Sequence, residues 1–359
     1  MQSPNDKGEF LRHYLIMTDM TPKQIKAALE AGIITDAQAK AMHKTQALSD
    51  THAVIGNEDD MRFVRSFSDV FIGIGIGLFA LGLWALGGLT GGGMSYLFAA
   101  GVMALMAGYF GRKTRQHLPT LITALAFLIF THKGLGGVLG INSEIMTALI
   151  TIVAMLAYYA FIRLPFCIAL IAISVIFLVF ALANQFSPNA LQGNKSWLFI
   201  TSGLVTLCVA IYYDMKDTQR KTRFADNAFW LHLTAAPLIV HGLAFRAAIA
   251  KSDMLLGLVP VLMVEKTDAI GLLVIVGLIG LLGLALNRRA LLVSSLGYAG
   301  FAIVFLFSGS GVGFGLSLAL AFLLLGATVI FLGAGWHKAR NTLIKILPKW
   351  KIFPPAYKP

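Results

Sequence analysis

Long apolar runs alternate with short polar connections from about residue 67 to residue 335. Runs of roughly 17–25 apolar residues match a helix that crosses a ~30 Å hydrocarbon core, and they differ from the alternating pattern of membrane β-strands. The pattern predicts an all-α, polytopic transmembrane helical bundle with about ten spans, of which the third is marginal in length. We place them at residues 68–89, 94–111, 117–131, 144–162, 164–184, 196–213, 227–249, 269–286, 290–308 and 312–335.

Residues 1–66 are mostly polar, so the first apolar run has the wrong position and flanks for a secretory signal peptide. Thr21 with Gln24, and Thr35 with Gln38, have the spacing of capping boxes, and Gly32 fits a left-handed helix exit between them. The pattern predicts a cytoplasmic helical hairpin at residues 20–48, followed by a polar linker.

Two interpretations of this hairpin remain open. It is either a small solvated unit with its own core or a docking module for a protein partner. A DNA-binding helix-turn-helix is disfavoured, because the second helix offers Lys40 and Lys44 but no arginine for base edges. The expected core residues are Ile25, Leu29, Ile33, Ile34 and Met42.

These patterns divide the chain into three parts: the hairpin and linker at residues 1–66, the bundle at 67–335 and a basic cytoplasmic tail at 336–359.

Composition agrees with a membrane protein, since 57% of the 359 residues are hydrophobic and only 13% are charged. Cys167 and Cys208 both fall in apolar runs and are interpreted as small buried hydrophobic residues. The sequence therefore indicates no disulfide, no metal site and no cofactor.

Lysine and arginine in the short connections indicate orientation, because they resist translocation. Sixteen lie on one side against five on the other, which predicts that both termini are cytoplasmic. The net charge of +12 then reflects this bias and attraction to anionic lipid in the bilayer, with no nucleic-acid partner. The sixteen are Arg112, Lys113, Arg115, Arg163, Lys216, Arg220, Lys221, Arg223, Arg288, Arg289, Lys338, Arg340, Lys345, Lys349, Lys351 and Lys358, and the five are Lys133, Lys195, Arg246, Lys251 and Lys266.

Residues 254–264 form an apolar run too short to cross the bilayer. We interpret it as a re-entrant or interfacial helix on the outer side, because a crossing would turn the later basic connections outward.

Two glycine motifs resemble nucleotide-binding loops but lack a preceding strand. They are GIGIG at residues 73–77 and GVGFG at residues 311–315. In lipid, the spacing of Gly73 with Gly77 and of Gly311 with Gly315 is typical of helices that pack closely.

The seventh span carries the candidate chemistry. Asn227, Thr234 and His241 are seven residues apart and share one helical face, while His232 and Arg246 lie on roughly the opposite face. His232 is expected near the cytoplasmic interface and Arg246 near the outer one, whereas His241 is expected deeper, facing the bundle interior.

Pro237 in the same span removes a backbone donor and frees the carbonyl of Leu233, as would suit a kinked helix that lines a polar cavity. His241 either donates a structural hydrogen bond to a neighbouring helix or handles a substrate or proton. The two histidines lack the spacing of metal ligands. Asp214 and Asp226 are expected to pair with the basic residues of the connection between them.

Three stretches carry a resemblance to a known family: LEAGIITDAQAKAM, FVRSFSDVFIGIGI and RFADNAFWLHLTAAPLIVH. They resemble a group of bacterial polytopic inner-membrane proteins, the domain-of-unknown-function 2157 group, which have a short helical N-terminal region before eight to ten spans. The resemblance implies a bacterial inner-membrane location and no established activity, so no functional residue is carried over.

Two functions remain from the sequence. The first is a permease-like protein that moves a small molecule or lipid through a polar cavity lined by the seventh span, since ten spans divide into two inverted halves of five. The second is a membrane scaffold or sensor whose hairpin binds a partner. An enzyme is disfavoured, because no acid, base or metal set is clustered.

Overall fold

The computed structural model describes residues 22–42, 67–140, 143–217, 220, 222–247, 253–255, 259–261 and 266–347. These residues are almost entirely helical. The elements are α2 (Pro22–Glu30), α4 (Phe67–Thr90), α5 (Gly93–Ala107), the π-helix η1 (Gly108–Lys113), α6 (His117–Leu139), α7 (Glu144–Ile162), α8 (Phe166–Phe186), α9 (Pro188–Lys216), α10 (Arg223–Ala247), β1 (Asp253–Leu255), β2 (Val259–Val261), α11 (Lys266–Leu286), α12 (Arg289–Ser308) and α13 (Phe314–Ile346).

The chain separates into two compact units, residues 1–60 with Pro359 and residues 61–358. In the first unit, α2 is followed by a second helical segment at residues 36–42. The capping box at its start is confirmed, because Thr35 N–H donates to Gln38 Oε1 at 2.8 Å and Gln38 N–H donates to Thr35 Oγ1 at 3.4 Å. Gly32 ends α2 with φ +67°, as predicted. The proposed box at Thr21 lies outside the described residues.

The hairpin has its own small core. Ile25, Ala28, Ile34 and Ala39 are buried together, with Leu29 and Met42 packed against them. Ile33 was expected in this core, but it is 76% exposed because it follows directly after the turn at Gly32.

The second unit is a helical bundle, as predicted. Among the described residues, nine helices are long and apolar enough to cross a membrane. The predicted seventh span, α10, is also a helix of 25 residues but is not among these nine. Its neighbours explain why: α10 packs against α8, α9, α11 and α12, so it needs little apolar surface toward lipid.

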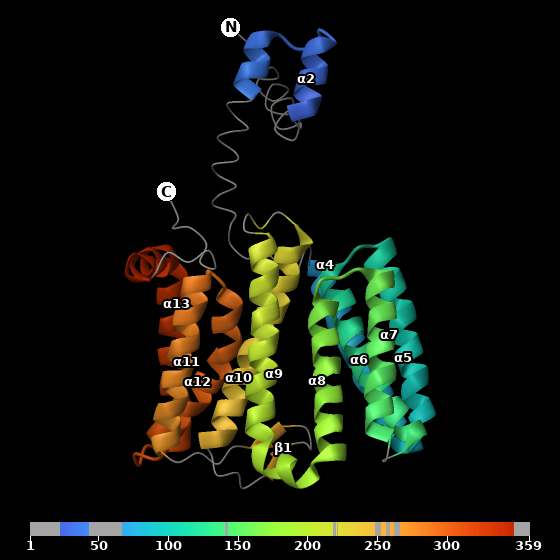
Figure 1. The fold of residues 1–359 in the computed structure, drawn as a ribbon, viewed down its shortest axis with the longest axis vertical. Coiled ribbons are helices and arrows are strands. Elements are labelled where there is room, and N and C mark those ends of the chain that lie inside the picture. Colours follow the sequence, from blue (N-terminus) through green and yellow to red (C-terminus); the bar gives the residue numbers. More distant parts are fainter. Residues whose placement is uncertain are drawn as a thin grey trace. The chain divides into compact units, whose positions relative to one another are not determined.

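Successive long helices alternate in direction (Figure 1). The alternation brings the start of α4 and the end of α13 to one end of the bundle. We call this the basic end, after the arginines Arg112, Arg163, Arg220 and Arg288 that it carries. The opposite end holds the connection between α8 and α9 and the strands β1 and β2.

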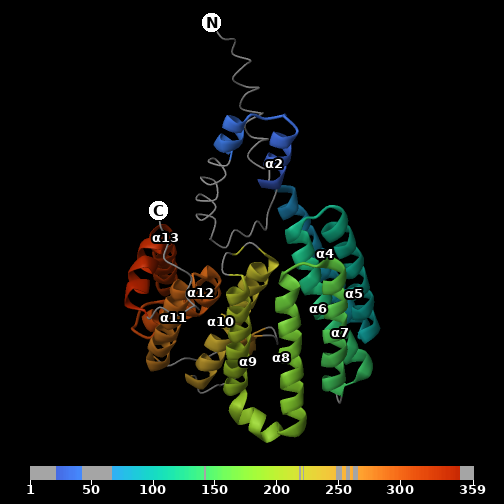
Figure 2. The same cartoon turned by 45° about the horizontal axis from the view of Figure 1, so that its top comes forward.

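The helices form two groups, one of α4–α7 with η1 and one of α9–α13 (Figures 1 and 2). Helix α8 packs against α6 and α7 of the first group and against α9 and α10 of the second. It is therefore the main element that joins the groups within the described residues.

Glycines bring two helix pairs close together. An added Cβ at Gly93 would lie 2.5 Å from the Gly134 carbonyl oxygen, so α5 and α6 touch backbone to backbone. Between α9 and α10, a Cβ at Gly203 would lie 2.7 Å from Ile239, and one at Gly242 would lie 2.7 Å from the Ser196 carbonyl oxygen. Small residues permit such contacts in membrane helices.

The glycines singled out in the sequence have different surroundings. A Cβ at Gly73 would lie 3.1 Å from Ile122, which places Gly73 at the contact of α4 with α6. A Cβ at Gly77, Gly311 or Gly315 would meet no atom within 4 Å, so close packing within the described chain does not require glycine at these three positions. Gly311 has φ +85° and lies in the turn between α12 and α13, where backbone conformation favours glycine.

Some helix boundaries and one element type differ from the sequence predictions. The marginal third span is α6, which continues to Leu139 and has 23 residues. Helix α13 continues to Ile346, beyond the boundary expected at residue 335. Within the run at 254–264, β1 and β2 form an antiparallel hairpin that pairs Met254 with Pro260, so the expected interfacial helix is wrong for the strand residues. Pro260 disfavours a helix there, because it lacks a backbone donor.

Candidate functional site

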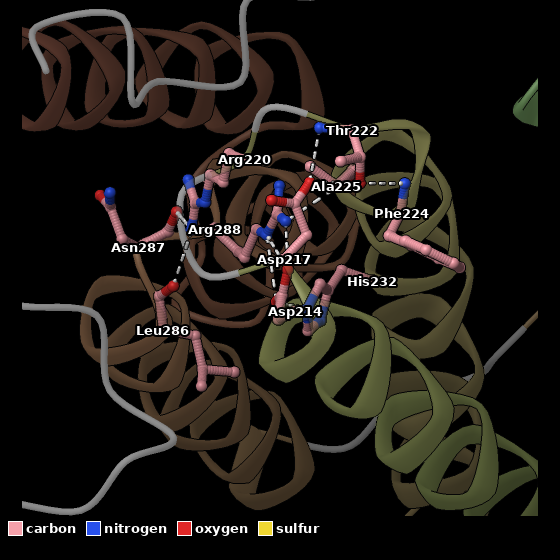
Figure 3. A network of polar contacts seen from close by, with 10 residues as sticks. All are labelled: Asp214, Asp217, Arg220, Thr222, Phe224, Ala225, His232, Leu286, Asn287 and Arg288. Atoms are coloured by element: carbon pink, nitrogen blue, oxygen red, sulfur yellow. Dashed lines mark hydrogen bonds and ion pairs between the residues drawn. The ribbon is translucent and has the colours of Figure 1, made fainter.

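The polar residues of α10 meet partners from distant parts of the chain at the basic end (Figure 3). His232 is 0% exposed, and its Nε2 lies 2.8 Å from Oδ2 of Asp214 in the last turn of α9. The small residues between α9 and α10 allow this contact, because they let the two helix axes approach closely.

Arg288 is the second partner of Asp214. It stands just before α12, and its Nε donates to Asp214 Oδ1 at 3.1 Å while its Nη2 also contacts Oδ1. The Arg288 side chain is 2% exposed and the Asp214 side chain 14% exposed. Two guanidinium nitrogens on one carboxylate give a charge-assisted contact with a fixed geometry. Asp214, His232 and Arg288 therefore connect α9, α10 and the start of α12.

A second arginine stabilises the same region. Arg220 Nη2 donates to the carbonyls of Leu286 at 3.1 Å and Asn287 at 2.9 Å, at the C-terminal end of α11. A cation is favourable there, because the last carbonyls of a helix carry partial negative charge. Asn287 has φ +54° and its Oδ1 accepts a hydrogen bond from Trp336 Nε1 at 2.9 Å, which attaches α13 to the cluster.

The connection between α9 and α10 is closed by its own hydrogen bonds. Asp217 Oδ2 accepts from the Thr222 backbone N–H at 2.7 Å and from its hydroxyl at 2.6 Å. The Thr222 hydroxyl oxygen accepts from Phe224 N–H at 3.2 Å, which is the geometry of an N-cap for α10. This loop therefore holds the start of α10 beside Arg288.

The expectation for Asp214 is wrong. Asp214 was expected to pair with the basic residues of its own connection, but it binds Arg288, 74 positions further on, because the end of α9 lies beside the turn between α11 and α12. His232 does lie near one end of the bundle, as predicted, but it is completely buried by neighbouring helices instead of being near solvent.

The predicted stripe of Asn227, Thr234 and His241 also contacts protein. His241 Nδ1 lies 3.1 Å from the Tyr298 hydroxyl on α12, and its ring meets Phe199 of α9 edge-on at 4.9 Å. Thr234 donates to the Trp230 carbonyl one turn earlier at 2.9 Å. Asn227 is 6% exposed, and its Oδ1 accepts no hydrogen bond from the described residues. The contacts with Tyr298 and Phe199 leave His241 half-buried between α12 and α9.

Pro237 and Arg246 also belong to α10. The helix continues through Pro237 without ending. The backbone of Arg246 belongs to α10, but its side chain is outside the described part of the structure.

A separate cavity of 810 Å³ lies at the opposite end of the first helix group. It is bounded by the junction of α4 and α5, by the last turns of α6, by the start of α7 and by α8. No residue of α10 lines it, so this cavity is not the one expected from the seventh span. A Cβ at Gly91, Gly136 or Gly140 would meet no atom within 4 Å, so the absence of side chains at these positions leaves space open. Eight glycines line the cavity: Gly87, Gly88, Gly91, Gly92, Gly93, Gly136, Gly137 and Gly140.

Polar groups line the cavity at two depths. At its mouth, Asn184 Nδ2 donates to Glu144 Oε2 at 3.1 Å, and Lys133 lies nearby on α6. Further in, Thr147 is 3% exposed, and its hydroxyl has no hydrogen-bond partner among the described residues. His132 lines the same space and stacks at a tilt on Phe177, with ring centroids 4.6 Å apart.

The hydrogen bonds around His132 assign its ring protons. Thr151 donates its hydroxyl to the Thr147 carbonyl at 2.7 Å, so its oxygen accepts from His132 Nδ1 at 3.3 Å. A neutral His132 then carries its proton on Nδ1, which leaves Nε2 as an acceptor. The cavity lining thus contains an imidazole, an amide and a carboxylate.

The sequence interpretation missed this cavity, although a signal was present. GGLTGGG at residues 87–93 and GLGGVLG at residues 134–140 are dense in glycine, and His132, Lys133 and Glu144 flank the second of them. In the described residues, no group of three or more histidine, cysteine, aspartate or glutamate side chains is placed to hold a metal ion.

The chain is a multi-pass integral membrane protein, since it has many long apolar helices. Its central helix has buried polar contacts, and its cavity combines polar groups with apolar walls. Comparison with protein-family models, with curated proteins and with solved structures finds no match.

Proposed function

We propose that the protein is a permease-like membrane protein that binds a small polar molecule in the cavity between α5, α6, α7 and α8. The observation that carries the proposal is the polar lining of this cavity, in which Asn184 is hydrogen-bonded to Glu144 and both His132 and Lys133 of α6 take part.

The dimensions and chemistry of the cavity suit a small ligand. Its volume of 810 Å³ falls in the range of small-molecule sites, which combine apolar walls with a few polar groups. Asn184 and Phe177 are seven residues apart on α8, so the cavity extends about 10 Å along the helix. The opposite charges of Glu144 and Lys133 favour a neutral or zwitterionic molecule.

Transport requires that the cavity be reached from both sides of the membrane. The two helix groups joined by α8 are the bodies that would rock against each other. We place the basic end in the cytoplasm of a bacterial inner membrane, on the loop charge bias and on the resemblance to the domain-of-unknown-function 2157 group. The cavity then opens outward in the described conformation.

Cysteine accessibility tests the proposal without knowledge of the substrate. Ala181 lines the cavity and is 7% exposed, so Ala181→Cys introduces a reporter thiol there. In a Cys208→Ser background, the other remaining thiol is that of Cys167, which is buried. A membrane-impermeant methanethiosulfonate reagent is added to right-side-out and to inverted vesicles. The proposal expects labelling from both faces, because alternating access exposes the cavity to each side in turn.

The control is Phe98→Cys in the same background, since Phe98 is 70% exposed on the surface of α5 and should face lipid. It should label from neither face. Labelling of Ala181→Cys from one face only would contradict transport and leave a binding or sensing role for the cavity.

A scaffold or sensor is the second candidate, and the separate core of the hairpin favours it. Ile33 is a large apolar side chain exposed on this unit, where a protein partner could bind. Deletion of residues 1–48 would remove that role and leave the labelling pattern of the cavity unchanged.

A further inference from the structure

A groove on the lateral surface of the first helix group has the form of a lipid site, independently of the cavity. Helices α5 and α7 both pack on α6, and a groove of 410 Å³ lies between them. Small residues such as Gly101, Ala104 and Ala157 leave it open, and Phe127 and Tyr158 contribute larger apolar surface.

The groove is almost entirely apolar. Its main polar group is the Tyr158 hydroxyl, which lies 3.4 Å from the hydroxyl of Thr123 and so has a hydrogen-bond partner within the protein. An apolar groove that follows the helices in a bilayer suits an acyl chain, since burial of apolar surface is its main source of binding energy.

The end of the groove is positively charged. The Arg112 guanidinium lies 4.4 Å from the ring centroid of Phe161, which lines the groove, and Lys113 and Arg163 follow at the ends of η1 and α7. All three are exposed, and none forms an ion pair with a carboxylate among the described residues. An anion can therefore approach Arg112 without displacing an internal partner.

The π-helix η1 carries two of these charges, Arg112 and Lys113. It packs on α6 and α7 at the basic end. A Cβ at Gly111 would lie 2.9 Å from Thr120 and 3.2 Å from Ile162, which shows how closely the backbone of η1 lies on both helices. Single-turn π segments are frequent at functional sites.

We propose that this lateral groove binds one anionic phospholipid, with an acyl chain between α5 and α7 and the headgroup phosphate on Arg112, Lys113 and Arg163. The commitment to a lipid follows from the continuity of the apolar groove with the cationic end, because a soluble phosphate ester would use only the second part. The groove runs within the apolar surface of the bundle, and its charges lie where helices end, at the level expected for phospholipid headgroups.

Native mass spectrometry of the purified full-length protein tests this proposal. The protein is titrated in detergent with palmitoyl-oleoyl phosphatidylglycerol or with the phosphatidylcholine of the same chains. Arg112→Gln should weaken phosphatidylglycerol binding about fivefold, since one basic residue near a membrane surface contributes about a fivefold factor. Ala157→Phe, which fills the groove, should weaken it more than tenfold. Inorganic phosphate at millimolar concentration should not displace the lipid.

Matched controls separate the site from general effects. Arg223→Gln removes the same charge from an exposed arginine of the other helix group, and Ala85→Phe adds the same ring to an exposed position on α4. Both should bind like the wild type. If Ala157→Phe does not fold, Ala104→Leu on the facing wall replaces it.

Three outcomes would overturn the proposal. Equal affinity for the two phospholipids would make the groove a non-selective contact with lipid. An unchanged affinity in both Arg112→Gln and the groove-filling variant would place the bound lipid elsewhere. Conversion of a dimer to a monomer by Ala157→Phe with retained lipid would identify the groove as a contact between two copies of the chain.

Discussion

Removal of the Asp214 carboxylate should strongly destabilise the protein. Asp214→Asn removes the anion that both the Arg288 guanidinium, 2% exposed, and His232, 0% exposed, contact. Loss of one member of a buried ion pair costs about 3–5 kcal/mol, because the remaining charge stays desolvated. We therefore expect the free energy of unfolding to fall by about 3–5 kcal/mol.

Denaturant titration in detergent micelles, followed by helical circular dichroism, measures this change. A double-mutant cycle with Arg288→Gln isolates the pair, and the double variant should cost at least about 1 kcal/mol less than the sum of the two single variants. Glu144→Gln is the control, because Glu144 is exposed and its loss should cost less than about 1 kcal/mol. A cost below about 1 kcal/mol for Asp214→Asn, or additive single effects, would refute the buried ion pair.

Four further outcomes follow from the structure. Gly93→Ala should cost about 1–3 kcal/mol of unfolding free energy by overpacking α5 against α6, whereas Gly82→Ala, with no atom within 4 Å, should cost nothing by the same titration. Tyr298→Phe should cost about 1 kcal/mol by removing the hydrogen bond to His241, and an unchanged midpoint would contradict that bond. Deletion of residues 1–48 should leave a monodisperse bundle on size-exclusion chromatography, and aggregation would show that the hairpin packs on the spans. A reporter fused to the C-terminus should be active in the cytoplasm, and external activity would reverse the proposed orientation.

Hydrophobic runs were sufficient to predict the helices, because a membrane span must satisfy its backbone internally and cover itself with apolar side chains. They were not sufficient for helix ends. His132 and Lys133 lower the local hydropathy near the end of α6, so its predicted end came eight residues early, at residue 131 instead of Leu139. The strands at 253–255 and 259–261 were also missed, since a short apolar run does not distinguish an interfacial helix from a hairpin.

The polar contacts show a second limit of prediction from sequence, which concerns the partners of each side chain. Periodicity predicts that His232 and His241 lie on opposite faces of α10, but it does not indicate which helix each side chain meets. Both meet α9, where His232 contacts Asp214 and His241 contacts Phe199. Asp214 meets Arg288 only because α9 and α12 both contact α10, and that arrangement is a property of the folded bundle. The glycine-lined cavity likewise requires that five helices, α4 to α8, meet at one end of the bundle.

The low hydropathy of α10 has a consequence for biogenesis. A helix with two histidines, a proline and terminal arginines is a poor substrate for release into lipid on its own, since each charged or strongly polar residue opposes partitioning from the insertion machinery. Helix α9 is synthesised immediately before it and carries Asp214, 18 positions before His232. If α9 and α10 insert as one hairpin, the Asp214 carboxylate and the His232 imidazole contact each other and are both shielded from acyl chains. Arg288 emerges from the ribosome only after α11, so its ion pair with Asp214 can form only when the later helices assemble around this hairpin.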